Sequence, residues 1–146
     1  MWKNNIEALK LLLNVPNIDV NIVDNRGRST VHWALGSGYF DGVDTWSTRG
    51  QYFEVLKLLL SHPSLTALTL NQKDKDNGET PVMLAARLKR PVIESEKQFG
   101  LKHLELLVAD PRVDLDTTDM KGRRLEEWIW WVFLSIIYVF IFFPQC

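Results

Sequence analysis

Leu11-Leu-Leu-Asn-Val-Pro16 is the first of three similar stretches that decide the fold; the others are Leu58-Leu-Leu-Ser-His-Pro63 and Leu106-Leu-Val-Ala-Asp-Pro111. Their prolines lie 47 and 48 residues apart. Proline lacks an amide hydrogen and clashes with the preceding helical turn, so each proline predicts the end of a helix. One pattern that recurs at a nearly constant spacing predicts a repeat protein.

The residues before each proline have the spacing of an amphipathic helix. Apolar side chains recur at i, i+3, i+6 and i+7, which places them on one helical face. These residues are Ile6, Leu9, Leu12 and Leu13 in the first copy, Phe53, Leu56, Leu59 and Leu60 in the second, and Leu101, Leu104, Leu107 and Val108 in the third. We therefore expect three helices, none of which can bury its apolar face alone.

A turn that contains glycine follows each of these helices, after a β-tending stretch. The turns are Asp24-Asn-Arg-Gly27, Asp76-Asn-Gly78 and Asp119-Met-Lys-Gly122. Glycine adopts positive φ without steric cost, and aspartate bonds the nearby backbone. A second helix is expected after each turn; in the middle copy Pro81 suits its first position, where no amide partner is needed.

The stretch Asp24-Asn-Arg-Gly-Arg-Ser-Thr-Val-His-Trp-Ala34 resembles the signature of the ankyrin repeat family, Asp-x-x-Gly-x-Thr-Pro-Leu-His-x-Ala, with Gly38 at the later glycine. Gly78-Glu-Thr-Pro-Val-Met-Leu-Ala85 is a second copy, and Asp119-Met-Lys-Gly-Arg-Arg-Leu-Glu126 keeps only the turn. The resemblance implies an all-α, ankyrin-type solenoid of stacked helix-turn-helix repeats with β-hairpin-like turns. It also implies a structural hydrogen bond from His32 to neighbouring loop backbone.

The repeats depart from the family pattern in length and completeness. Family repeats have about 33 residues, whereas extra residues here fall between the helices, at 39–51 and roughly 90–99. The middle turn has an extra residue, so that Asp74 and Asp76 both miss the aspartate position. The last turn lacks the inner helix that should follow, and we expect a fragment or a degenerate protein. We divide the chain into an ankyrin-repeat domain at 1–127 (half repeat 1–23, repeats 24–73 and 74–118, partial repeat 119–127) and an apolar tail at 128–146.

The tail carries sixteen residues without a charge, from Trp128 to Phe143. As a helix it would span about 24 Å, slightly less than the ~30 Å hydrocarbon core of a bilayer. Lys121, Arg123 and Arg124 precede it, as is typical of a cytoplasmic membrane boundary. Three interpretations stay open: a C-terminal apolar helix that anchors the chain in a membrane, non-native sequence translated past an exon end, and a helix buried on the last repeat.

Composition and motifs point away from catalysis and from nucleic acid. The formal net charge is −1, so the chain lacks an overall basic surface. No pair among His32, His62 and His103 has metal-ligand spacing, and no catalytic motif appears, so we expect no metal, no cofactor and no enzyme activity. Cys146 is the single cysteine, which fits a reducing intracellular, cytoplasmic location.

The ankyrin resemblance implies a binding surface made of hairpin tips and the inner-helix face. We therefore expect a monomeric, non-catalytic module or scaffold that binds a partner protein, either cytoplasmic or tail-anchored through the apolar run. Trp and Arg are common interface anchors, although Trp33 could instead pack between repeats. Carried over position by position, the partner-binding residues are Asn25, Arg26, Arg28, Trp33 and Ser37 in the first repeat, and Asn77, Glu79, Leu84 and Arg87 in the second.

Overall fold

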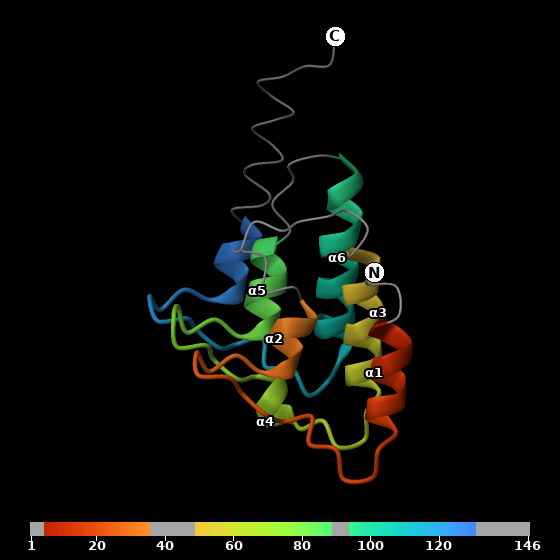
Figure 1. Ribbon diagram of the computed structural model, residues 1–146. Helices are drawn as coiled ribbons and strands as arrows, with labels where there is room; N and C mark the ends of the chain where they lie inside the picture. The colour runs from red at the N-terminus through yellow and green to blue at the C-terminus, as the bar shows by residue number, and fades with distance from the viewer. Residues whose placement is uncertain (1–4, 36–48, 89–93, 131–146) are drawn as a thin grey trace.

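A computed structural model describes residues 5–35, 49–88 and 94–130 of the chain (Figure 1). Its helices are α1 (Asn5–Leu13), α2 (Thr30–Ala34), α3 (Arg49–Leu60), α4 (Ala67–Leu70), α5 (Pro81–Leu88) and α6 (Glu94–Ala109), and residues 125–130 are also helical. Within these ranges the extended pairing amounts to two isolated bridges, Val23 with Ser29 and Thr118 with Arg124. The prediction of an all-α protein is confirmed for the described part of the chain.

The helices form two rows (Figure 1). In the outer row α3 packs against both α1 and α6, and in the inner row α2 packs against α5. The helical segment 125–130 follows α5 in the inner row (Figure 1). The rows are joined in pairs, because α2 packs against α3 and α5 against α6. An extended loop and a turn connect each outer helix to the inner helix that follows it in the chain. We call an outer helix, the turn after it and that inner helix a unit.

The core lies between the rows and is built from the apolar faces predicted above. Leu56, Leu59, Leu104 and Leu107 are all buried. Ala85 and Ala86 of α5 are also buried, and their small side chains let the rows approach. Each leucine removed from water contributes roughly 1.5–3 kcal/mol before entropy is counted. The spacing of apolar residues therefore predicted the outer helices, but their buried faces only in part. Leu12 of α1 and Val108 of α6 were expected on the buried face and are 54% and 45% exposed.

The three turns share one design. The amide of each turn glycine donates to the carbonyl of an aspartate, over 2.9 Å from Gly27 to Asp24, 3.2 Å from Gly78 to Asp74 and 3.1 Å from Gly122 to Asp119. The three glycines have φ values of 73°, 68° and 74°, which side chains rarely adopt. The expectation that Asp74 misses the aspartate position is wrong, since its carboxylate accepts hydrogen bonds from the amides of Asn77 and Gly78 and so accommodates the extra residue.

The last turn is followed by an inner helix after all, which corrects the prediction that this helix is missing. Residues 125–130 are helical, Leu125 is buried, and Ile129 packs against the core. The amide of Arg124 donates to Glu127 Oε1 over 3.2 Å, as the amide of Ser29 donates to His32 Nδ1 over 3.0 Å. This helix begins with the same type of cap as α2, although its sequence lacks Thr-Pro.

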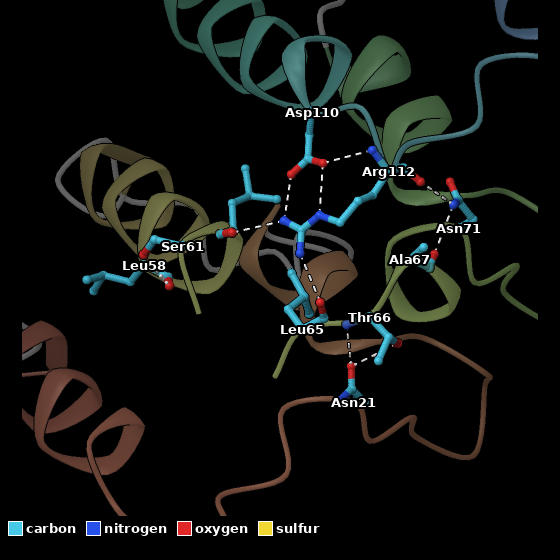
Figure 2. Close-up of polar contacts among 10 residues, drawn as sticks. Asn21, Leu58, Ser61, Leu65, Thr66, Ala67, Asn71, Asp110 and Arg112 are labelled. Atoms are coloured by element: carbon cyan, nitrogen blue, oxygen red, sulfur yellow. Dashed lines mark hydrogen bonds and ion pairs between the residues drawn. The ribbon is translucent and has the colours of Figure 1, made fainter. Parts of the chain in front are cut away.

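Asparagine side chains tie each unit to the next one (Figure 2). Asn21 donates to the carbonyl of Ser64 over 2.7 Å. It accepts from the amide of Thr66 over 3.0 Å, which Figure 2 shows. Asn71 donates to the carbonyl of Arg112 over 2.8 Å, also in Figure 2, and accepts from the amide of Asp114 over 2.7 Å. In both sets, the two residues that bond to the asparagine lie one and three positions after a helix-ending proline. The two sets of bonds are therefore equivalent. Successive units therefore stack in the same register.

The remaining predicted segments fall largely outside the described residues. Of the insertions predicted at 39–51 and roughly 90–99, residues 39–48 and 90–93 are not described, whereas residues 49–51 begin α3 and residues 94–99 begin α6. Ser37 and residues 131–146 of the apolar tail also lie outside the described residues. Among the residues that are described, no helix has the length and apolarity needed to cross a membrane. The segment from Pro63 to Gly78 is four residues longer than that from Pro16 to Gly27, and it contains α4, whose Leu68 is exposed.

Candidate interaction surface

Trp33 is fixed in place by two neighbours although it is 46% exposed. Its indole Nε1 donates to Asp24 Oδ2 over 3.2 Å. The guanidinium carbon of Arg28 lies 4.3 Å from the centre of the Trp33 ring, and Arg28 Nη2 lies 2.8 Å from Asp24 Oδ2. An exposed indole that is already ordered loses little entropy when a partner covers it.

The contact between arginine and tryptophan recurs at the last turn, but the indole Nε1 of Trp128 is buried and lacks the hydrogen bond that Trp33 makes to Asp24. The guanidinium carbon of Arg123 lies 4.2 Å from the ring centre of Trp128, and its Nη2 lies 2.7 Å from Asp119 Oδ2. Aspartate, arginine and tryptophan have the same spacing here as in the first turn. This shared spacing is a signal in the sequence that pattern analysis missed, and it places Trp128 in the repeat rather than at the start of an unrelated tail.

The middle unit replaces this cluster with a buried pair. Glu79 stands where the other turns have arginine, and Leu84 where they have tryptophan; both are buried. Glu79 Oε2 lies 3.1 Å from Arg87 Nη2. Burial raises the pKa of Glu79 above its usual value, although Arg87 opposes the shift. Burial excludes Glu79 and Leu84 from the exposed surface, while Arg87 stays partly exposed.

The hairpin tips are held by backbone bonds that leave their side chains exposed. The amide of Lys75 donates to the carbonyl of Arg26 over 2.8 Å, and the amide of Met120 donates to the carbonyl of Asn77 over 2.9 Å. The side chains of Asn25, Arg26 and Asn77 are exposed. Arg26 makes a loose ion pair with Asp76, 3.9 Å apart. The tips therefore form a ridge of fixed backbone and accessible polar side chains.

Charges along this surface are already balanced by neighbours. Burial alone would raise the pKa of Asp24 and Asp119, but hydrogen bonds from Arg28 and Arg123 outweigh it and hold both pKa values below the usual range. Each carboxylate therefore stays ionised beside its arginine. The result is a surface with paired charges beside the exposed Trp33.

His32 has a structural role, as its position in the resemblance implies. Its Nε2 lies 3.1 Å from the carbonyl of Glu79 in the next turn, while Nδ1 accepts from the amide of Ser29. This pattern assigns the proton to Nε2. Burial lowers the pKa of His32, so the ring is neutral near pH 7. The predicted hydrogen bond to neighbouring loop backbone is confirmed.

In the part of the chain that the structure describes, no three His, Cys, Asp or Glu side chains are grouped so that they could hold a metal ion. No family of known proteins has a model that matches this chain, and the curated proteins include no match either.

Proposed function

We propose that this chain is an ankyrin-type repeat protein, a non-catalytic module that holds a partner protein along its hairpin tips and inner row. Paired rows of helices, aspartate–glycine turns and the bond from His32 to the next turn all support this proposal. Repeat stacks expose one continuous surface built from equivalent positions in successive units. Binding along such a surface needs no catalytic group.

The observation that carries the proposal is the fixed and exposed Trp33 beside exposed tip residues. Trp33 is ordered by Asp24 and Arg28, and Asn25 and Arg26 belong to the same turn. Tryptophan and arginine dominate the binding energy of many protein interfaces. The backbone bond from Lys75 to Arg26 joins this tip to the next, so that a partner meets one surface.

Affinity capture with a double variant tests this surface. Arg26→Glu with Trp33→Ala should abolish retention of a partner protein, because the variant removes the indole and reverses a charge at the tip. Arg26 is exposed, and Trp33 is 46% exposed and lies outside the hydrophobic core, so the far-ultraviolet circular dichroism should not change. Retained proteins would be compared by quantitative mass spectrometry.

Lys57→Glu is the matched control, since it reverses an exposed charge on the outer helix α3. Retention by Lys57→Glu should equal that of the unmodified chain. The proposal requires at least one protein that both the unmodified chain and the control retain and that the double variant loses. If no protein behaves in this way, the proposal fails.

A second candidate function is a tail-anchored protein whose repeats recruit that partner to a membrane. It is favoured by the sixteen uncharged residues from Trp128 to Phe143. Because Trp128 packs in the last unit, the informative deletion is 131–146. An anchored chain should pellet with membranes after carbonate extraction and become extractable once these residues are deleted. Full extraction of the intact chain would reject the anchor.

A further inference from the structure

Basic side chains outnumber acidic ones among the exposed charges of the three turns. The turns lie side by side along one edge of the stack (Figure 1). Over residues 24–29, 73–80 and 119–124, the exposed charged residues are Arg26, Lys73, Lys75, Lys121 and Arg124, with Asp76 as the single acidic one. Positive charge is therefore concentrated at this edge, although the formal charge of the whole chain is −1.

The turn aspartates face inward instead. The carboxylates of Asp24, Asp74 and Asp119 each accept hydrogen bonds from amides of their own turn. The side chain of Asp119 is fully buried, that of Asp24 is 22% exposed, and Asp74 is also partly buried. A partner that approaches the turns therefore meets ammonium and guanidinium groups before it meets these carboxylates.

Two of the exposed cations have acidic neighbours that are also exposed. Arg124 Nη2 lies 2.8 Å from Asp116 Oδ1, so we leave Arg124 out of the surface defined here. Arg26 Nη1 lies 3.9 Å from Asp76 Oδ2, and such a loose pair in water stabilises little, so a partner carboxylate can replace it. We call the remaining cations, Arg26, Lys73, Lys75 and Lys121, the tip ridge.

Lys73 and Lys75 are held at the junctions between turns. Lys75 Nζ donates to the carbonyl of Asn25 in the first turn over 3.1 Å, and Lys73 Nζ donates to the carbonyl of Thr118 beside the last turn. The stem of Lys75 lies against Gly27, where a Cβ would be 3.1 Å from Lys75 Cγ. An ammonium has three donors, so each lysine keeps donors for a ligand. Because both side chains are already ordered, an anion that binds them costs less entropy.

We propose that the tip ridge binds an acidic, extended segment of a partner protein. This inference rests on the proposed function and names the chemistry of the partner. Backbone bonds from Lys75 to Arg26 and from Met120 to Asn77 join the three turns, so one continuous segment reaches all the cations of the ridge, whereas a single small anion does not. Nucleic acid fits less well, because a long polyanion extends beyond the ridge and meets the net negative charge of the rest of the chain.

Fluorescence anisotropy with a labelled poly-glutamate peptide tests the proposal on the full chain, in one non-ionic detergent throughout. The peptide should bind, and a poly-glutamine peptide of the same length should not. The affinity should fall as salt is added, because salt screens exposed charges. Lys75→Glu with Lys121→Glu should weaken binding by roughly tenfold or more, since two attractive contacts become repulsive.

Lys10→Glu with Lys57→Glu is the matched control. It changes the net charge by the same amount, at exposed lysines of the outer helices α1 and α3, and should bind the peptide as the unmodified chain does. A milder variant, Lys75→Gln with Lys121→Gln, removes both charges but keeps a donor at each position. It should bind with an affinity between those of the unmodified chain and the glutamate variant, and its far-ultraviolet circular dichroism should not change.

Failure of poly-glutamate to bind, or equal losses of affinity in the ridge variants and the control, would overturn the proposal. So would a single-stranded DNA, long enough to pass beyond the ridge, that binds more tightly than the peptide. Because the peptide is a defined probe, these outcomes would reject only the acidic chemistry of the partner. Affinity capture with the double variant at Arg26 and Trp33 tests the proposed function separately, so the two failures are distinguishable.

Discussion

Arg112 shows how a single side chain joins two units. Its Nη1 donates to the carbonyl of Leu65 and its Nη2 to the carbonyl of Leu60, both over 2.9 Å (Figure 2). Leu60 ends α3, where the last carbonyls of a helix lack intrahelical donors. Asp110 holds the guanidinium in place, and the hydrogen bond from Arg112 lowers the pKa of Asp110.

Arg112→Ala should therefore lower the free energy of unfolding by about 1–3 kcal/mol, because two carbonyls lose a charged donor. Urea titration measures the change. Arg124→Ala serves as the control: its ion pair with Asp116 is solvent-exposed, so its loss should cost about 0–1 kcal/mol. Equal effects of the two substitutions would contradict a linking role for Arg112.

The buried and neutral His32 makes stability depend on pH. Burial lowers its pKa in the folded chain below the usual value of 6.5, so the unfolded chain binds the proton more readily. The contribution of neutral His32 to the free energy of unfolding is therefore complete above pH 6.5. It is lost as the pH falls through the lowered pKa of the folded chain. Glu79 acts in the opposite direction, since its raised pKa favours the folded state in acid.

His32→Gln should remove this part of the acid sensitivity while keeping the helix cap, because Gln accepts from the Ser29 amide as Glu127 accepts from Arg124. The measurement is the difference in urea midpoint between variant and unmodified chain at pH 7 and at pH 5. The variant should lose less stability between these two values. An identical loss in both chains would show that His32 does not titrate with unfolding.

Among the elements, the turns differ in how tightly they are packed. A Cβ at Gly78 would lie 2.8 Å from the amide nitrogen of Met120, in the next turn, whereas a Cβ at Gly122 would meet no atom within 4 Å. Both glycines have positive φ, so alanine is strained at either site, by about 1–2 kcal/mol.

Gly78→Ala should consequently destabilise the chain by clearly more than Gly122→Ala, since it adds a backbone clash between neighbouring turns to the same strain. Thermal unfolding followed by circular dichroism compares them directly. Similar melting temperatures for the two variants would mean that the middle and last turns do not touch.

Sequence patterns predicted some elements well and others poorly. The spacing of Leu56, Leu59, Leu104 and Leu107 predicted the outer helices because helical periodicity is a local property. The inner helix at 125–130 was missed because its cap uses Glu127 in place of the family residues. The burial of Glu79 and Leu84 could not be inferred, since it depends on packing between units that are distant in sequence.

For the whole molecule, stability rests on contacts between units. Each unit offers asparagine, carbonyl and apolar groups that the next unit completes, and the first and last units repeat the same design around Trp33 and Trp128. Such stacks gain stability from nearest-neighbour interfaces more than from any single unit. Stacking in one register is therefore the central structural claim.

Amide hydrogen exchange, followed by nuclear magnetic resonance, tests this claim most directly. The amides of Asn25, Lys75 and Met120 hold the same place in their turns, but only the latter two donate to a preceding turn. We predict that Lys75 and Met120 exchange more slowly than Asn25 by an order of magnitude or more. Exchange of all three amides at similar rates would contradict the stacked arrangement.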